Sequence, residues 1–325
     1  QDNIGIRGQL LWKPTEALEV TVAGDWNRQE AVCCGSVYVR TGLTQRPLDR
    51  QFAALADALD YAPPSTNPYD RLADVDSTLN AGNDLGGASL RVKWNLGQGT
   101  LTSVTAWRFW DWRPENDRDF TGLSIVAKSQ NPSQQNQYTQ ELRYNYSGDR
   151  FDFVLGGFAF YQRIDTQGTE QHGRHSSRWS LNPATTLADG ITRLIDTPSV
   201  LEGLTAINTQ YLKNTSLALF GQLSWKVSDD FTIQPGVRVN YDKKDGFYQR
   251  RVFLADTTEI FTTATTPGGP LTGDARTIND ARIGVFAPQE ISPSFSDWNF
   301  SYDLTANYKV TPDILVYGSY AKTFK

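Results

Sequence analysis

Apolar and polar residues alternate strictly over several stretches of this sequence, and this pattern limits the possible folds more than any other feature. Over 231–241 the residues Phe, Ile, Pro, Val, Val and Tyr occupy every second position. A period of two places successive side chains on opposite faces of a β-strand, so the pattern predicts an all-β protein. The predicted strands cover about 3–12, 18–26, 88–96, 100–111, 138–146, 151–165, 214–226, 231–241, 298–309 and 313–324.

The connections between these ten predicted strands alternate in length. Tight turns rich in Gly, Pro, Asp and Ser, which turns favour, lie at 13–16, 97–99, 147–150, 227–230 and 310–313. Long polar connections lie at 28–86, 112–136, 166–213 and 245–297. Long loops are unusual in a compact soluble domain, whereas a transmembrane β-barrel has short periplasmic turns and long extracellular loops. The alternation therefore favours an antiparallel, up-and-down transmembrane barrel.

Alternation alone also fits a soluble β-sandwich, which buries one face of each sheet. Two further features favour the membrane. The strands run ~10–12 residues, the length that crosses a bilayer at a tilt. Aromatic residues also gather at the strand ends beside the short turns, as in the interfacial girdle of an outer-membrane barrel. These aromatic residues are Trp12, Trp94, Tyr144, Tyr146, Phe151, Trp225, Phe231 and Tyr308.

Composition excludes other classes of protein. The mean hydropathy is −0.47 and no run of ~18 apolar residues occurs, which excludes a membrane protein built from helices. The net charge is −5 with both signs interspersed, so no basic footprint for nucleic acid is present. None of the common catalytic or phosphate-binding motifs occurs, so we expect no enzyme and no cofactor.

The cost of placing charge in lipid assigns the two faces of the predicted strands. A cation facing lipid near the midplane costs ~2–4 kcal/mol. We therefore expect one set of residues to face the lumen, namely Arg91, Arg143, Arg238 and Asp303. We expect a second set to face lipid, namely Val92, Trp94, Val237, Val239, Tyr302 and Leu304.

The order of turns also places the ends of the chain. The first strand leads into a short turn and the last strand follows one, so we expect Gln1 and Lys325 at the extracellular rim. Complete barrels of this kind normally keep both termini in the periplasm, and an unpaired strand edge is costly in lipid. We therefore expect at least one more strand on each side, which makes 1–325 an internal part of a single larger barrel domain.

Several stretches resemble a known family in their order and spacing. They are "TLTSVTAWR" (100–108), "QYTQELRYNYSGDRFDFVLGGFAFYQ" (137–162), "SLALFGQLSWKVSDDFTIQPGVRVNYDKK" (216–244) and "DILVYGSYAKTFK" (313–325). Together they resemble the strands of TonB-dependent outer-membrane receptors, particularly siderophore-receptor-like members. The likeness covers most of the strands and none of the long loops.

The resemblance implies a 22-stranded barrel, of which about ten strands are present here, in the outer membrane of a bacterium. It also implies an N-terminal plug domain and further strands outside this sequence. The implied function is energised uptake of a scarce ligand, most often a ferric siderophore. The implied partners are outer-membrane lipid, that small-molecule ligand and the periplasmic TonB protein, which acts through the plug. The alternatives are a passive porin-type channel or another outer-membrane barrel with long loops, such as an enzyme or adhesin.

Aromatic and basic residues near the outer strand ends are the candidates for ligand binding. Trp107, Trp110 and Trp112 either form the outer aromatic girdle or in part face inward as a stacking platform. Loop arginines and aromatic residues could offer positive charge and stacking surface to an anionic ferric chelate, although each could equally pack within its loop. The candidates are Trp110, Trp112, Arg113, Arg174, Arg178, Trp179, Tyr248 and Arg250.

Two loop motifs contain residue types that can bind metal, but neither motif is specific. The pair His172 and His175 lacks a third ligand, so we interpret it as part of a solvated loop. The acidic segments 74–76 and 115–119 could hold a loop calcium ion, or they could be ordinary solvated carboxylates. We therefore assign no metal ligand from the sequence.

The only two cysteines, Cys33 and Cys34, are adjacent. The expected compartment is oxidising, so a pair of free surface thiols is not expected to persist. We predict a vicinal disulfide that shapes the start of the first long loop, with bonds to cysteines outside this sequence as the alternative. Gly35 follows directly and tolerates the unusual backbone angles of such a ring.

Overall fold

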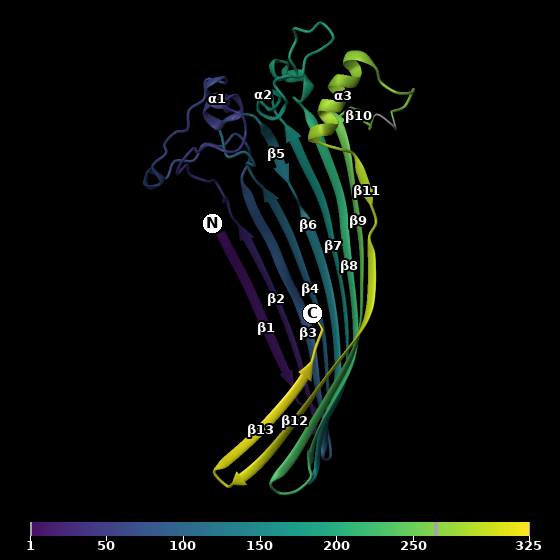
Figure 1. Ribbon diagram of the computed structural model, residues 1–325. Coiled ribbons are helices and arrows are strands. Elements are labelled where there is room, and N and C mark those ends of the chain that lie inside the picture. Colours follow the sequence, from purple (N-terminus) through teal and green to yellow (C-terminus); the bar gives the residue numbers. More distant parts are fainter. Residues whose placement is uncertain (1, 263–265, 325) are drawn as a thin grey trace.

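The chain forms one antiparallel β-sheet whose long strands pair with their neighbours in sequence (Figure 1). The computed structural model describes residues 2–262 and 266–324. The long strands are β1 (Asp2–Trp12), β2 (Leu18–Glu30), β3 (Asn80–Leu96), β4 (Gly99–Glu115), β6 (Ser133–Ser147), β7 (Phe151–His172), β8 (Leu204–Lys226), β9 (Phe231–Leu254), β12 (Ser294–Thr311) and β13 (Ile314–Lys322). These ten strands match the ten predicted, and the predicted all-β antiparallel fold is confirmed.

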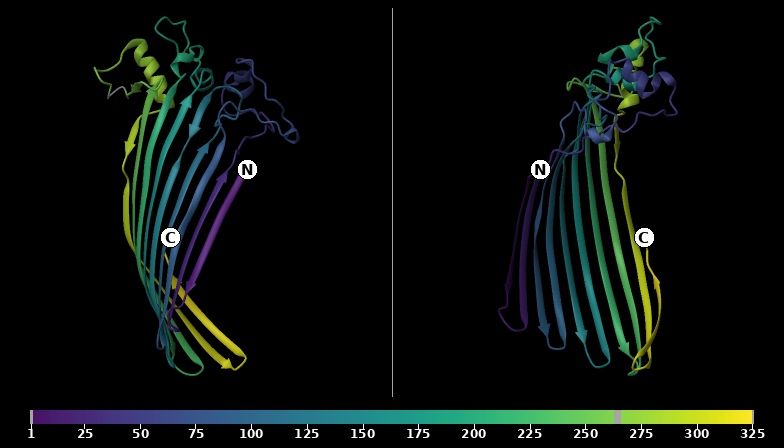
Figure 2. Two further views of the ribbon diagram at one scale, coloured as in Figure 1. Left: turned by 180° about the vertical axis from the view of Figure 1, so that it is seen from behind. Right: turned by 90° about the vertical axis from the view of Figure 1, so that its left-hand side faces the viewer.

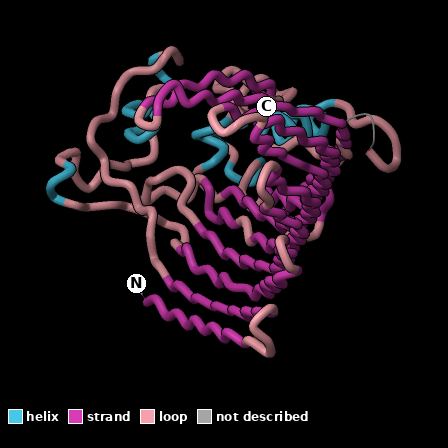
Figure 3. The backbone as a smooth tube through the Cα atoms, turned by 90° about the horizontal axis from the view of Figure 1, so that it is seen from below, coloured by secondary structure: helices cyan, strands magenta, loops and turns pink. Residues whose placement is uncertain are grey.

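The short connections all lie at one end of the sheet, as predicted. In Figures 1 and 2 the turns after β1, β3, β6, β8 and β12 lie at the lower rim, and every long connection lies at the other end. Three short strands join the sheet near that far end: β5 (Val126–Gln130), β10 (Thr258–Ile260) and β11 (Gln289–Ile291). Seen along the strands, the sheet is an open arc (Figure 3).

Strand register places the two predicted sets of side chains on opposite faces, which confirms their separation. Directly paired residues in an antiparallel sheet share a face. One transverse row of pairs runs Val92, Ser103, Leu142, Gly157, Leu219, Val239 and Phe300. A row on the other face runs Thr102, Arg143, Gly156, Phe220, Arg238 and Ser301. We call these faces the apolar face and the polar face.

One glycine explains the close packing on the polar face. A Cβ at Gly156 would lie 2.4 Å from the Phe220 ring, so only glycine leaves room for that ring. The Arg238 guanidinium in turn lies 5.6 Å from the centre of the Phe220 ring, a cation–π distance. An aromatic ring can therefore lie on a face that is otherwise charged and polar.

Two levels of aromatic residues bound the apolar face. All eight aromatic residues predicted beside the short turns lie on this face, and the Phe151 and Trp225 rings stack at 6.1 Å. A second level is the paired row Trp107, Tyr138 and Tyr161. Tyr161 lies ten residues after Phe151. At ~3.3 Å per residue and a tilt of ~45°, this span is ~23 Å high, which is close to the ~25 Å apolar band of a membrane barrel.

The strands run further outward than the alternation predicted. β7, β8 and β9 have 22, 23 and 24 residues, and each continues past the Tyr161 level. The predicted connections 166–213 and 245–297 were therefore too long at both ends. The extensions are irregular in hydropathy because neither face contacts lipid there, so the period-two pattern is lost.

The long connections form a folded layer, which we call the cap: residues 31–79, 116–132, 173–203, 255–262 and 266–293. Its helices are α1 (Phe52–Asp57), α2 (Ser176–Ser180) and α3 (Gly273–Val285), with 3₁₀ turns at Leu48–Arg50, Pro68–Asp70, Leu194–Asp196 and Pro198–Val200. The long polar connections are therefore folded rather than irregular. Leu194 and Leu201 of the cap are fully buried together with Leu204 of β8 and Val252 of β9, and Ile278 and Ile283 of α3 pack against this cluster. None of the helices in the described residues has both the length and the apolar character needed to cross a membrane.

Both edge strands of the described sheet have one neighbour each. β1 pairs with β2, and β13 pairs with β12 from Thr311–Ile314 to Tyr302–Lys322. The expected positions of Gln1 and Lys325 at the outer rim concern residues outside the described part of the chain.

Candidate ligand site at the outer end of the polar face

The three tryptophans at the end of β4 divide between the two faces. Trp107 lies on the apolar face and stacks on Phe109 with ring centres 5.3 Å apart. Trp110 and Trp112 lie on the polar face, where their rings stack at 5.4 Å and 18°. The sequence left both roles open, and the structure places Trp107 in the girdle and the other two on the face that carries Arg143.

A single transverse row links these tryptophans to another pair of candidates. Through successive strand pairs, Trp112 is level with Tyr248 on the polar face. The row runs Trp112, Ser133, Thr166, Gln210 and Tyr248. We call it the outer row. Its members are aromatic, hydroxyl and amide side chains, which can stack on a ligand and exchange hydrogen bonds with it.

Tyr248 and Arg250 are held by one acceptor at the end of the outer row. The Tyr248 hydroxyl donates to Asn208 Oδ1 at 2.7 Å, and Arg250 Nε donates to the same oxygen at 2.9 Å. The Arg250 guanidinium lies 5.8 Å from the Tyr248 ring centre and 5.7 Å from that of Phe286. These contacts fix a cation and a phenol beside each other before any ligand binds.

Sequence reasoning missed Asn208, Gln210 and Phe286. The first two fall in a stretch that we had interpreted as a loop, where β8 continues beyond the membrane band. If the alternation of 214–226 is continued towards the N-terminus, Asn208 and Gln210 fall on the same face as Ser216, which is the polar face. Phe286 follows α3, and no local pattern brings it to Arg250.

The remaining candidates lie elsewhere. Arg113 is on the apolar face, paired with Asp84 at 2.9 Å and Asp111 at 3.3 Å. Arg178 pairs with Asp196 at 2.9 Å within the cap. The Trp179 ring meets Phe52 edge-on at 5.7 Å, and Arg174 Nε lies 3.2 Å from His175 Nε2. These four side chains lie on the apolar face or within the cap, so the outer row and Arg250 are the candidate ligand site.

The two histidines are structural parts of the cap, so their interpretation as a solvated loop is wrong. His172 ends β7 and is buried, with Nδ1 3.2 Å from the Ile125 carbonyl oxygen and its ring against Phe286 at 4.7 Å. Burial lowers the pKa of His172 to about 4. His175 Nδ1 accepts from the Ser124 amide at 3.0 Å. Both imidazoles therefore hold residues 124–125 in place through contacts with their backbone.

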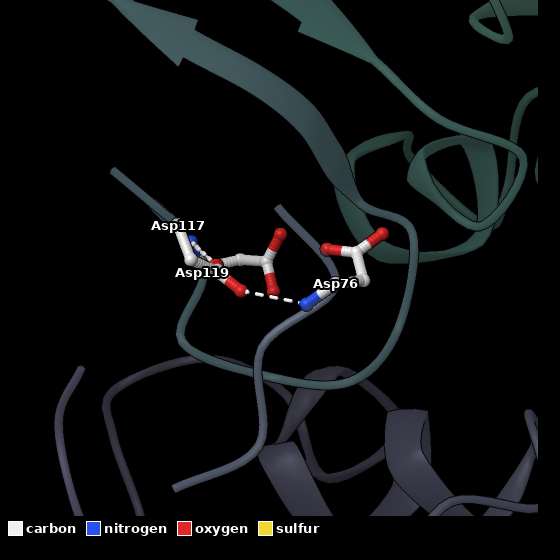
Figure 4. Close-up of side chains that lie close together, drawn as sticks. All are labelled: Asp76, Asp117 and Asp119. Atoms are coloured by element: carbon white, nitrogen blue, oxygen red, sulfur yellow. Dashed lines mark hydrogen bonds between the residues drawn. The ribbon is translucent and has the colours of Figure 1, made fainter. Parts of the chain in front are cut away.

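The fold brings the two acidic segments together in the cap (Figure 4). Oxygen atoms of Asp76, Asp117 and Asp119 all lie within 4.8 Å of one another. Asp117 is fully buried and accepts from the amides of Asp76, Asp119 and Phe120 at 2.8–3.1 Å. Burial raises the pKa of Asp119 to about 6 and also raises that of Asp76. A proton or a divalent cation here would relieve the repulsion between the carboxylates, while the amides already hold the turn.

The adjacent cysteines lie at the start of the cap. The sulfur atoms of Cys33 and Cys34 are 2.19 Å apart, in a disulfide between neighbours. Cys34 has a φ of 82°, in the left-handed region that non-glycine residues rarely adopt. Cys34 also lines a depression of about 490 Å³ with Trp112, Asn116 and Arg118, so it lies near the outer row.

Comparison with known proteins decides the family. Residues 36–325 match the family described as TonB dependent receptor-like, beta-barrel. The chain belongs to this family. The receptor's barrel therefore lies in a bacterial outer membrane, with its apolar face against lipid. The family consists of transporters, and we assign no catalytic residue to the receptor.

Three solved structures share the fold at low sequence identity. The ferric yersiniabactin uptake receptor FyuA of Yersinia pestis is 16% identical with a TM-score of 0.55. The ferric-catecholate import receptor Fiu of E. coli in its open form is 12% identical, with a TM-score of 0.53. The siderophore receptor PiuA of Acinetobacter baumannii is 11% identical, with a TM-score of 0.52.

The chain spans less than half the length of each of these three chains. It aligns over 98–99% of its own length but covers only 36%, 46% and 41% of the three chains. No curated protein sequence matches the chain.

Proposed function

We propose that this chain forms part of a TonB-dependent transporter that takes up a ferric siderophore across the bacterial outer membrane. The observation that carries the proposal is the outer row with Arg250, on the polar face of a barrel of this family. Stacked rings, amides and one cation at the outer end of a lumen suit a bulky polar chelate. The three solved receptors that share the fold are named for siderophore uptake, which supports the same ligand class.

In this proposal Trp110 and Trp112 offer a flat surface to the ligand. Gln210 and Tyr248 exchange hydrogen bonds with it, and Arg250 attracts negative charge on the chelate. Release inward depends on a plug domain outside this sequence, which periplasmic TonB pulls on. Lower on the polar face, Arg143 and Arg238 would contact that plug.

Energy dependence tests the transport mechanism. Cells that express the full-length receptor are given radioactive iron bound to candidate siderophores, with and without a proton uncoupler. Energised transport predicts that the uncoupler abolishes accumulation. Uptake that continues at the same rate would instead favour the passive channel.

Paired tryptophan variants test the ligand site. We expect Trp112→Ala to weaken siderophore binding about tenfold, because a lost stacking contact is worth ~1–1.5 kcal/mol. Trp107→Ala is the matched control, since Trp107 belongs to the same strand but to the apolar face. Equal affinities of the two variants for the siderophore would remove the outer row from the proposed site.

A further inference from the structure

A depression of about 490 Å³ lies beside Trp112, where β4 ends and the cap begins. Its lining comes mainly from two segments, 114–118 and 129–131. Backbone hydrogen bonds join the two segments: the Asn116 amide donates to the Ser129 carbonyl at 3.0 Å, and the Asn131 amide donates to the Pro114 carbonyl at 3.3 Å. The backbone therefore holds the depression in shape, and the side chains that line it are left for other contacts.

Four polar side chains of this lining have no partner in the chain. Within residues 2–262 and 266–324, no hydrogen bond or ion pair involves the side chains of Glu115, Asn116, Ser129 or Asn131. Asn116 Oδ1 is moreover buried, and no donor of these residues reaches it. A buried polar atom without a hydrogen bond is costly, because it has lost its contact with water and gained nothing in return. Four such side chains around one depression indicate that their partner is a ligand.

The chemistry of the lining selects the kind of ligand. The two asparagine amides and the serine hydroxyl can both donate and accept hydrogen bonds, whereas the Glu115 carboxylate only accepts. A ligand hydroxyl also does both, whereas an ammonium group only donates and a carboxylate only accepts. Trp112, Pro114 and Cys34 add apolar surface, on which the C–H groups of a sugar ring can lie. The lining therefore suits a sugar, which carries several hydroxyls on an apolar ring.

We propose that this depression binds a sugar ring carried by the siderophore, so that the transported ligand is a glycosylated ferric chelate. This inference rests on the proposed siderophore function. Trp112 belongs both to the depression and to the outer row, so one ligand can occupy both. From Trp112 to Tyr248 the outer row crosses four strand pairings, which span about 19 Å along the sheet. The anionic chelate would lie towards Arg250, and its sugar would lie towards Cys34.

The test compares two chelates on the full-length receptor in mild detergent, by isothermal titration calorimetry. One is a ferric tris-catecholate, and the other is the same chelate with glucose attached to its catechol rings. We expect the glucosylated chelate to bind about tenfold more tightly, because its hydroxyls satisfy the free side chains. Asn116→Ala should weaken binding of the glucosylated chelate about fivefold and leave the plain one unchanged. Asn182→Ala is the matched control and should change neither, since Asn182 is in the cap but its Oδ1 accepts from the Ala184 amide at 3.0 Å.

The outcomes separate this inference from the function on which it rests. Equal affinity for the two chelates, or an equal effect of Asn116→Ala on both, would overturn the sugar site and leave siderophore uptake in place. If neither chelate binds but free maltose does, and Asn116→Ala abolishes its binding, the sugar site stands and siderophore uptake is overturned. No binding of any of the three ligands would overturn both proposals.

The stability of the Asn116→Ala variant gives an independent check. Because Asn116 Oδ1 has no partner in the described chain, its removal should not lower the unfolding temperature of the receptor without ligand. A clear loss of stability would show that Asn116 holds the cap together, and would overturn its assignment to the sugar site.

Discussion

The sheet and the cap place their apolar side chains in opposite environments. On the sheet, Leu219 and Trp298 are 72% and 69% exposed, because the apolar face has no protein over it. In the cap, Leu194 and Leu201 are 0% exposed, at the centre of a core of the kind found in soluble domains. One chain therefore uses two solvents: lipid stabilises the sheet, whereas water drives the cap to fold. Changes at equivalent residues should thus have different effects in the two regions.

The largest difference is expected when a leucine is shortened. Leu201→Ala should lower the free energy of unfolding of the cap by ~2–5 kcal/mol, because it leaves a cavity in a dry core. Leu219→Ala is the control, since lipid chains fill the space that it vacates. Protease cleavage of the cap in intact cells measures the first effect, and heat resistance of the barrel on gels measures the second. Equal protease sensitivity in both variants would contradict the two-solvent comparison.

A charge introduced into the sheet tests the lipid side of the comparison. Leu217→Arg should cost ~1–2 kcal/mol of bilayer stability, because Leu217 is on the apolar face, two residues inside the upper aromatic level and away from the midplane where the cost is greatest. Ser216→Arg, one residue away on the polar face, should cost much less. Reversible folding into lipid vesicles at a series of denaturant concentrations gives both values. A larger loss for Ser216→Arg would reverse our assignment of the two faces.

Acid should act on the cap through two groups with opposite signs. The Asp119 pKa is raised to about 6, so the folded cap binds this proton more tightly than the unfolded chain does, and stability rises as the pH falls through 6. The His172 pKa is lowered to about 4, so stability falls as the pH drops from its ordinary value near 6.5 towards 4.

Single variants separate these two contributions. Asp119→Asn removes the largest carboxyl contribution, so the histidine effect should dominate and the cap should loosen between pH 7 and pH 5. His172→Gln removes the largest imidazole contribution, so the carboxyl effect should dominate and the cap should tighten over the same range. Hydrogen exchange of the amides at 117–126 measures both. If the two variants respond to acid with the same sign, one of these pKa shifts is wrong.

The smallest effect is expected at Cys33 and Cys34. A disulfide between adjacent residues closes almost no loop, so it removes little entropy from the unfolded chain. Replacing both cysteines with serine should change the unfolding of the cap by less than ~0.5 kcal/mol, as for other surface substitutions. Mass spectrometry with and without reductant tests the bond, since reduction adds two hydrogens. A protein whose mass does not change on reduction has no such disulfide.

The same division of solvents explains what the sequence could predict. Lipid on one side and a wet lumen on the other impose period two, so Val92, Val239 and Arg238 could be assigned to faces without coordinates. Above the membrane band that constraint ends, and the outer parts of β8 and β9 looked like loops. Leu194, Val200 and Leu201 follow no period, because contacts distant in sequence bury them. Half of the candidate site, namely Trp112, Tyr248 and Arg250, could be chosen by residue type, but the common row of Trp112 and Tyr248 follows only from strand register.

The length of β7 has a consequence for what can reach this receptor from outside. His172 lies eleven residues beyond Tyr161, which at ~3.3 Å per residue and a ~45° tilt raises the strand end ~26 Å above the membrane band. The cap is thus carried about one membrane thickness into the sugar layer that surrounds the cell. Antibodies and bacteriophages approaching the surface would meet the folded cap first. Sequence change in the cap could therefore alter recognition by such agents, while the sequence of the sheet below stays constrained by its contact with lipid.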